Sequence, residues 1–448
     1  MTVSQPRLKQ IFRDLLADAA GKALPPLTPR KVRGRVHFPG KASAVVGVRR
    51  AGKTTFLHQL RSAKHRDGTP LSLLPFVSFE DERLADLDAS DLTLLLDEYR
   101  RMFPESMEGD ACTAWHFDEI QLVRGWEQFV RRILETERDD VFVTGSSAAL
   151  LSREIATALR GRGWQVLLHP FSFEEAQRHG GTEIPPAGSR PPAKLRARME
   201  RAYADWLRSG GFPEAQGLAD SVRRQLLRDY VDVAMFRDVV ERHAVRNVTG
   251  LRWLVRQLLG NAGSLFSVEK FYRSLRSQGV SISKDSVHAL LGYLDDCFLI
   301  RVIWMESSSE RQRMVNPRKA YPADPGLIPI FDRTGKANHG HALETAVLLE
   351  LERRGCEITY VRTREGFEVD FLARRPDGGT DLIQVCTDLS DPATAAREIR
   401  ALQAAGSGMP EAGKLVLTLT AGGFPQELPL GVSVQTAWEW SLGRPAVH

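Results

Sequence analysis

Residues 44–57 read AVVGVRRAGKTTFL, an apolar run that passes into a glycine-rich turn and then into a second apolar segment. The central part, Gly47 to Thr54, matches the pattern G-x-x-x-x-G-K-[ST] without a gap. The preceding SAVV predicts a buried strand, and the following TTFLHQLRSA predicts an amphipathic helix. A phosphate-binding turn requires this strand–turn–helix context, which a chance glycine-rich turn would lack.

The residue types in this turn fit phosphate chemistry. Glycines allow backbone N–H groups to face phosphate oxygens, and the helix N-terminus adds the positive end of its dipole. Lys53 would reach the β- and γ-phosphates of a nucleotide, and Thr54 would ligate Mg²⁺. The sequence leaves open whether the two arginines of the turn contact phosphate or a subunit interface. The residues expected to bind the nucleotide are Gly47, Arg49, Arg50, Ala51, Gly52, Lys53, Thr54 and Thr55.

A phosphate-binding turn of this kind needs an acidic residue on a second strand, and TAWHFDEIQ (residues 113–121) supplies one. Its apolar residues predict a buried strand that ends in Asp118 and Glu119. We expect Asp118 to hold Mg²⁺ through water and Glu119 to polarise the attacking water as the catalytic base. The alternative is an ordinary acidic pair in an exposed turn.

The next predicted strand, DDVFVTGSS (residues 139–147), ends in the hydroxyl residues Thr144, Ser146 and Ser147. A hydroxyl at this strand end would lie between the phosphate loop and the acidic strand, where it could sense the γ-phosphate. We choose Ser146 for this role. A serine here can also be the N-cap of the helix that follows, and the two roles are compatible because several hydroxyls are present.

That following helix ends in REIATALRGRGW, which brings together Arg153, Arg160 and Arg162. Arginines at a helix C-terminus commonly interact with the helix dipole in solvent. Beside a nucleotide fold they can instead act in trans, where they neutralise charge on the γ-phosphate of a neighbouring subunit. Arg160 and Arg162 are the candidates for this catalytic role, and the sequence does not decide between the two interpretations.

Length and composition limit the classes of protein to which the chain can belong. A chain of 448 residues is expected to form about three domains, and 42% apolar with 26% charged residues is typical of a soluble globular protein. No apolar run approaches the roughly 20 residues that span a bilayer, and the N-terminus does not resemble a signal peptide, so we expect a cytoplasmic protein without membrane contact. The four cysteines are scattered singly, which argues against a zinc knuckle. A net charge of +5 permits a nucleic-acid partner.

With these segments in view, the chain resembles the AAA-type ATPases of bacteria and archaea that carry a trailing domain of unknown function. The resembling segments are GVRRAGKTT, FVSFEDERL, WHFDEIQ, TGSSAALLSREIATALRGR, HPFSFEEA and GGFPEA, which occur in this order between residues 40 and 240. The resemblance implies ATP as the nucleotide and a helical lid after the core. It also implies that Gly211 and Pro213 of the GGFP segment lie near the adenine, although the composition of this segment predicts only a helix-breaking turn.

Residues 264–303 carry the pattern of a winged helix, in which two helices with a turn between them are followed by a strand. The second helix and the strand would present Lys284, His288 and Arg301 outward as DNA-binding residues. Winged helices bind DNA through the second helix, but many pack against proteins instead. We expect DNA contact here, mainly to the phosphate backbone.

The C-terminal segment resembles the restriction-endonuclease-like terminal domain of the family. That fold places acids at Glu344 and Asp370 and an E/Q-x-K motif on the next strand, where this chain has Gln384-Val385-Cys386. In such a site the acids ligate Mg²⁺ and the lysine orients water. No lysine occurs between Lys336 and Lys414, so we expect no lysine in the site and a degenerate nuclease at Glu344, Asp370 and Gln384. The alternative is simple surface polarity.

The expected fold class is therefore α/β: an AAA-type P-loop ATPase core with a helical lid, a winged-helix domain and a C-terminal restriction-endonuclease-like α/β domain. The expected boundaries are 1–175 for the core with its N-terminal helix, 176–247 for the lid, 248–305 for the winged helix and 306–448 for the C-terminal domain. The leading function is an ATP-hydrolysing motor, a ring-forming homo-oligomer that binds, remodels or translocates DNA. The alternatives are a nucleotide-gated signalling or defence switch, whose C-terminal domain binds a partner, and an ATP-coupled nuclease.

Overall fold

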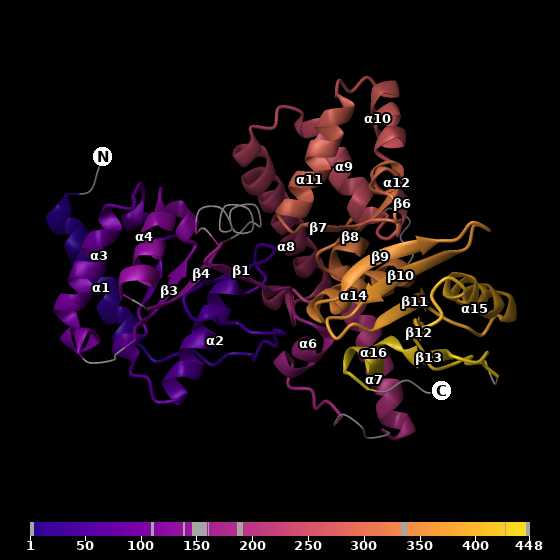
Figure 1. Cartoon of the computed structure of the whole chain (residues 1–448), viewed down its shortest axis with the longest axis horizontal. Coiled ribbons are helices and arrows are strands. Elements are labelled where there is room, and N and C mark those ends of the chain that lie inside the picture. Colours follow the sequence, from indigo (N-terminus) through magenta and orange to yellow (C-terminus); the bar gives the residue numbers. More distant parts are fainter. Residues whose placement is uncertain are drawn as a thin grey trace. The chain divides into compact units, whose positions relative to one another are not determined.

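The structure of the chain is a computed structural model (Figure 1) that describes residues 4–108, 112–137, 139–145, 159, 161–185, 191–332, 338–425 and 427–444. It divides into two compact units, Met1–Leu168 and His169–His448. The division falls a few residues before the boundary expected at residue 175. Across the described residues, every helix is too short or too polar to cross a bilayer.

Unit 1 is built on a five-stranded parallel sheet with the order β2-β3-β4-β1-β5. Its strands are β1 (Ala42–Val46), β2 (Phe76–Ser78), β3 (Ala114–Asp118), β4 (Asp140–Thr144) and β5 (Gly163–Leu167). Every residue of β1 and β3 is buried, as expected for the inner strands of a parallel sheet that is covered on both faces. The α/β class with a parallel sheet core is thus confirmed.

The strand order places functional segments together. β4 lies between β1 and β3, so the carboxyl ends of these three strands meet at one edge of the sheet. In open parallel sheets, ligands bind at this edge, outside the carboxyl ends of the strands. The loop after β1 and the acids after β3 therefore face the same region.

Helices pack against this sheet. α1 contacts α3 and β2, whereas α2 contacts β3 and β4. Among the described residues of unit 1, the helices are α1 (Gln5–Gly21), α2 (Lys53–Arg66), α3 (Asp91–Met102) and α4 (Trp126–Arg132), with the π-helical turn η5 (Ile133–Glu137) after α4. Short 3-10 turns are η1 (Leu71–Leu73), η2 (Glu82–Leu84), η3 (Pro104–Met107) and η4 (Ile120–Leu122).

Unit 2 begins with helices and continues into a small antiparallel sheet. The helices are α6 (Phe173–His179), α7 (Ala193–Ser209), α8 (Asp220–Val233), the π-helical η8 (Ala234–Glu241), α9 (Val248–Gly260), α10 (Val268–Ser277) and α11 (Lys284–Asp296), with the 3-10 turn η7 (Pro213–Ala215) before α8. The sheet has the order β6-β8-β7 and consists of β6 (Leu265–Phe266), β7 (Ile300–Ile303) and β8 (Arg318–Pro322), with α12 (Glu310–Val315) before β8. Ser267 and Ser283 accept backbone hydrogen bonds at the starts of α10 and α11, so the sequence itself marks where these helices begin.

The C-terminal part of unit 2 is a second five-stranded sheet with the order β13-β12-β11-β10-β9. β9, β10 and β11 pair antiparallel, whereas β11, β12 and β13 pair parallel. The strands are β9 (Glu357–Arg362), β10 (Glu368–Arg374), β11 (Thr380–Cys386), β12 (Gly413–Thr418) and β13 (Val432–Thr436). The accompanying elements are η9 (Pro325–Leu327), α13 (Ile328–Phe331), α14 (His339–Arg353), α15 (Pro392–Gly406) and α16 (Ala437–Ser441).

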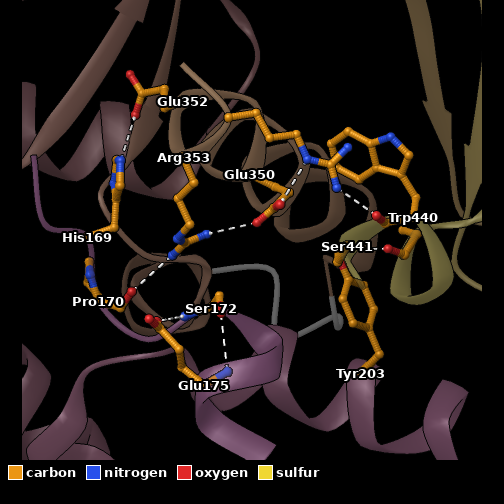
Figure 2. A network of polar contacts seen from close by, with 12 residues as sticks. His169, Pro170, Ser172, Glu175, Tyr203, Glu350, Glu352, Arg353, Trp440 and Ser441 are labelled. Atoms are coloured by element: carbon orange, nitrogen blue, oxygen red, sulfur yellow. Dashed lines mark hydrogen bonds and ion pairs between the residues drawn. The ribbon is translucent and has the colours of Figure 1, made fainter. Parts of the chain in front are cut away.

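One hydrophobic core joins the first and last helices of unit 2. It brings α6 and α7 together with α14 and α16 through buried side chains such as Phe173, Trp206 and Trp438. Figure 2 shows the polar contacts around this core: Arg353 of α14 donates to the carbonyl of Pro170 at 2.9 Å, and Tyr203 of α7 lies 3.5 Å from the hydroxyl of Ser441. Segments that are far apart in the sequence are therefore held as one body.

Candidate nucleotide-binding site

The loop after β1 has the backbone conformation that a phosphate-binding turn needs. Gly47 has φ 149°, and a Cβ built there would lie 2.1 Å from the carbonyl oxygen of Leu168, so only glycine fits. Gly52 has φ 93° in the left-handed region, and α2 begins at the next residue, Lys53. Arg50 also adopts positive φ, at 65°, which is uncommon for a residue with a side chain. Such strain is typical of ligand-binding turns.

The Lys53 ammonium lies within the turn. Its Nζ donates to the carbonyls of Gly47 and Val48 at 3.1 and 3.3 Å, and the residue is 5% exposed. The turn is also held from outside, because the buried Arg30 donates from Nη1 to the carbonyl of Ala51 at 2.8 Å. The backbone of Arg30 exchanges two hydrogen bonds with the amide of Gln59 on α2, at 2.7 and 3.0 Å. Sequence reasoning did not identify Arg30, which belongs to no helix or strand.

Asp118, at the end of β3, is the centre of a hydroxyl cluster. Its carboxylate accepts from Thr54 Oγ1 at 3.0 and 3.1 Å, from Ser78 Oγ at 3.1 Å and from Thr144 Oγ1 at 2.7 Å. The residue is 2% exposed, and burial raises the pKa of its carboxyl; the hydrogen bonds from the three hydroxyls act against this rise, whereas the Glu119 charge adds to it. The predicted Mg²⁺ residues, Thr54 and Asp118, are thus in direct contact.

A carboxylate and a hydroxyl side by side are the hard oxygen donors that Mg²⁺ prefers. The neighbouring loop would bind the triphosphate beside these two residues. The residues present therefore fit a nucleotide with its magnesium ion.

Glu119 follows directly and has a strained backbone, with φ 52°. Its N–H donates to Thr144 Oγ1 at 2.9 Å, and one of its carboxylate oxygens accepts from the Gln121 amide. Thr144 therefore holds both acids, since its hydroxyl donates to Asp118 and accepts from Glu119. Sequence reasoning named Thr144 as one of three candidates but chose Ser146, and it did not identify Ser78 or Gln121. Ser146 lies outside the described residues.

The remaining predicted residues lie in several environments. Arg160 is outside the described residues, while Arg162 forms an ion pair with Glu135 at 3.3 Å in which both side chains are more than two-fifths exposed. Gly211 belongs to unit 2, where its N–H donates to the buried Asp324 at 2.6 Å and its carbonyl accepts from Phe171 N at 2.6 Å. Pro213 begins η7 in the same unit.

The predicted DNA-binding residues differ in their charge state and partners. Lys284 pairs with Glu269 at 2.8 Å on the surface. Burial and then nearby positive charge lower the pKa of His288, so its imidazole is neutral at pH 7. Arg301 is tied by its guanidinium to Glu352 at 2.6 Å, with Asp295 at 3.8 Å. A salt bridge of this kind competes with any contact between Arg301 and a phosphate.

The predicted degenerate nuclease residues do converge, but with an addition. Glu344 of α14, Asp370 of β10 and Gln384 of β11 line a common cavity of about 440 Å³. The expectation that no lysine reaches this site is wrong, because Lys319 of β8 donates to Glu344 at 3.1 Å and to Asp370 at 3.0 Å. Lys319 precedes the stretch of sequence in which a lysine was sought. Burial raises the pKa of the Cys386 thiol to about 12, so this residue is neutral at pH 7.

Comparisons with known proteins agree with the geometry of unit 1. A family model described as an AAA domain matches residues 39–177, and one described as a domain of unknown function, DUF8612, matches residues 200–336. The uncharacterized protein MJ1544 of Methanocaldococcus jannaschii is 31% identical over 416 residues, which cover 90% of this chain and 89% of that protein. An uncharacterized protein of Haemophilus influenzae is 29% identical over 334 residues, covering 74% of this chain and 79% of that protein.

Solved structures show only distant similarity. The Orc1 protein of Aeropyrum pernix in complex with DNA matches with a TM-score of 0.27 and 14% identity, covering 74% of this chain and 92% of that one. DnaA of Aquifex aeolicus bound to AMPPCP matches with a TM-score of 0.26 and 11% identity, covering 66% and 89%. TM-scores this low do not bear on function.

Proposed function

This chain belongs to the same family as MJ1544 of Methanocaldococcus jannaschii, and from its AAA domain we propose that unit 1 binds ATP with Mg²⁺ and hydrolyses it. One observation carries the proposal: the Thr54 and Thr144 hydroxyls meet on the Asp118 carboxylate at the carboxyl edge of the parallel sheet. The positive end of α2 and the ammonium of Lys53 lie at the same edge.

Each side chain has a separate task in this proposal. The loop N–H groups and Lys53 bind the β- and γ-phosphates and neutralise charge that develops during transfer. Thr54 and Asp118 would hold Mg²⁺, which would supply positive charge to offset the negative charge of the phosphates. Glu119 accepts a proton from the attacking water, and Thr144 fixes the direction of its backbone.

Two substitutions separate binding from chemistry. Lys53→Ala removes the ammonium expected to reach the β- and γ-phosphates, and nucleotide binding measured with a fluorescent ATP analogue should be lost. Glu119→Gln should bind nucleotide normally and lower kcat roughly 100- to 10,000-fold, because it lacks the general base. Glu105→Gln on an exposed turn of the same unit is the matched control and should leave kcat unchanged. Normal hydrolysis by Glu119→Gln would show that the base is elsewhere.

We propose further that the chain acts as a homo-oligomer in which Arg162 reaches the γ-phosphate of a neighbour. What supports this role is the exposed ion pair between Arg162 and Glu135, because exposed pairs are worth about 0–1 kcal/mol and release their guanidinium at little cost. A guanidinium supplied in trans stabilises the charge of the transition state.

Mixed oligomers test this role directly. Arg162→Ala alone should bind nucleotide but turn over slowly, and Lys53→Ala alone should be inactive. Mixing the two proteins should restore part of the activity, because the Lys53→Ala subunits still supply Arg162 to their neighbours. Unchanged turnover in Arg162→Ala would show that Arg162 takes no part in hydrolysis. A mixture no more active than its components would argue against action in trans.

A specific observation favours DNA as the partner. A cavity of about 930 Å³ lies between α8, α9 and α13 of unit 2. Four arginines line it, against the carboxylates of Asp232 and Asp332, and Trp253 on its wall is 39% exposed. These arginines are Arg224, Arg228, Arg252 and Arg256. Guanidinium groups beside an exposed indole suit a strand that offers both phosphates and stackable bases. The α10–α11 pair and the β6-β8-β7 sheet, which we interpret as a winged helix, follow directly in the chain.

Fluorescence anisotropy with labelled single-stranded and duplex oligonucleotides tests this partner. The Arg252→Glu/Arg256→Glu double variant should weaken binding and reduce its dependence on salt, because two phosphate contacts are lost. Two separate exposed arginines on α10, Arg273 and Arg276, provide a double control of equal charge change. Equal weakening in both double variants would show that the cavity binds DNA only as part of a general basic surface. If the parent protein binds no oligonucleotide, DNA is not its partner.

The nucleotide-gated switch remains the competing function. It predicts tightly held nucleotide, slow turnover and no response to DNA. ADP found in freshly purified protein, together with turnover that oligonucleotides do not stimulate, would favour the switch over the motor.

A further inference from the structure

Three carboxylates from two elements converge on one ammonium in the C-terminal part of unit 2. Lys319 Nζ lies 3.1 Å from Glu344 Oε1, 2.9 Å from Glu368 Oε1 and 3.0 Å from Asp370 Oδ1. The Lys319 side chain is 3% exposed, and it comes from β8, the central strand of the β6-β8-β7 sheet. We infer that Lys319 takes the place of a divalent cation in this cluster, so that the cluster excludes metal and instead fastens the small sheet to the C-terminal sheet.

The stoichiometry of the contacts fits an ammonium. Lysine has three N–H donors, and each of the three carboxylates offers one oxygen at a charge-assisted hydrogen-bond distance. A bound Mg²⁺ needs oxygens at about 2.0–2.1 Å, and Ca²⁺ needs them at about 2.3–2.6 Å. An ammonium between the acids fills this space and repels a second cation. The residues present therefore do not fit the metal of a nuclease.

Further contacts from neighbouring elements surround Glu344 and Asp370. Tyr321, two residues along β8, donates from its hydroxyl to Glu344 Oε1 at 2.6 Å. Asp370 Oδ2 accepts from the N–H of Val385 on β11 at 3.0 Å. A Cβ at Gly263 would lie 2.8 Å from Glu344 Oε2, so the turn before β6 packs directly on this carboxylate. Glu344 Oε1 and both oxygens of Asp370 are thus already engaged by protein donors.

The position of Lys319 in the small sheet explains how this contact connects the two sheets. Lys319 is paired with Ile303 of β7 and with Leu265 of β6, so all three strands share its position. Its partners lie on α14 and β10, which belong to the C-terminal sheet and its covering helix. Breaking a buried ion pair leaves charges without partners, and this destabilises a protein more than the loss of a surface pair.

The test uses the full chain and Mn²⁺ as the probe, in an Asp118→Asn background that removes the magnesium residue of unit 1. Mn²⁺ binding is followed by electron paramagnetic resonance, and unfolding is followed by calorimetry. Any Mn²⁺ that the parent binds should be unaffected by Asp370→Asn. Lys319→Met should lower the unfolding midpoint of unit 2 by on the order of 5 °C or more and should gain a Mn²⁺ site. That site should disappear in Lys319→Met/Asp370→Asn.

Glu368→Gln provides a second measurement if Lys319→Met does not fold. Glu368 is one-third exposed, so its substitution should be tolerated, yet it should lower the unfolding midpoint more than Glu357→Gln on the neighbouring strand β9. Mn²⁺ binding by the parent that Asp370→Asn abolishes would overturn the inference. Equal midpoints for Glu368→Gln and Glu357→Gln would overturn the fastening role.

Discussion

Thr144→Val is the substitution that most directly tests the arrangement of the nucleotide site. Valine keeps the shape of threonine but lacks the hydroxyl that donates to Asp118 at 2.7 Å and accepts from Glu119 N at 2.9 Å. Asp118 keeps its bonds from Thr54 and Ser78, whereas the Glu119 N–H loses the partner that the structure gives it. The pKa of Asp118 should rise further, because one of the bonds that lowers it is gone.

The size of the effect follows from the two lost hydrogen bonds. An unsatisfied N–H costs about 1–3 kcal/mol when it is buried, and the half-buried Glu119 N–H falls in the lower part of this range; a hydrogen bond to a charged group contributes about 1.5–3 kcal/mol. Because Asp118 retains other donors, the sum for unit 1 should be about 2–5 kcal/mol in the free energy of unfolding. For turnover, a loss of 1.4–2.8 kcal/mol in transition-state stabilisation corresponds to a fall of roughly 10- to 100-fold in kcat.

Chemical denaturation and steady-state ATP turnover measure these quantities on the same protein. Ser43→Ala is the matched control, because Ser43 is fully buried on β1 and its hydroxyl has no hydrogen-bond partner among the described residues. The control should lose neither stability nor activity. Thr144→Val with wild-type stability and wild-type kcat would refute the view that this hydroxyl organises the two acids.

Other predictions concern separate parts of the chain. Gly47→Ala should abolish nucleotide binding, because its Cβ would lie 2.1 Å from Leu168 O, whereas Gly68→Ala carries a similar penalty for positive φ without a clash and should still bind. Burial raises the pKa of Asp324 to about 7, so its contribution to the stability of unit 2 is present below pH 4 and lost as the pH rises through 7; Asp324→Asn should flatten this part of the stability–pH profile. Iodoacetamide at pH 8 should modify the exposed Cys112 before Cys386, whose thiol has a pKa of about 12.

Each of these predictions has an outcome that contradicts it. Nucleotide binding by Gly47→Ala equal to that of Gly68→Ala would mean that the turn can move away from Leu168. A profile unchanged by Asp324→Asn would assign the pH dependence to other carboxyls. Mass spectrometry that finds Cys386 modified as fast as Cys112 would show that the thiol is more accessible than its burial indicates.

The sequence was sufficient where chemistry and position are local. The phosphate-binding turn and its flanking strand and helix lie within one short segment, so their spacing alone predicted them. Asp118 and Glu119 were found because strand ends can be recognised from an apolar run that stops at a charge. The contact of Thr144 with the two acids could not be found in this way, since it depends on strand register: Phe117 pairs with Val143, which brings the next residues, Asp118 and Thr144, together. The sensing role of Ser146 stays a prediction.

Contacts between distant segments account for what was missed. Ser78 pairs with Asp118 across β2 and β3, and nothing within FVSFEDERL indicates this pairing. The role of Lys319 was not predicted, because only the sequence after Lys336 was considered for a lysine, whereas Lys319 lies on a strand of another sheet. Charged side chains reach several ångströms beyond their own element, so a cluster of acids attracts a lysine by spatial rather than sequential proximity.

The anchoring of the nucleotide turn by Arg30 has a practical consequence for work on isolated fragments. A fragment that begins at β1 would retain every residue of the motif but lose the guanidinium that holds Ala51 and the backbone that brackets Gln59. It would also lose α1, whose Arg13 pairs with the fully buried Glu98. Weak nucleotide affinity in such a truncation would reflect where the gene was cut, and only a version that retains the N-terminal segment reports the strength of the native turn.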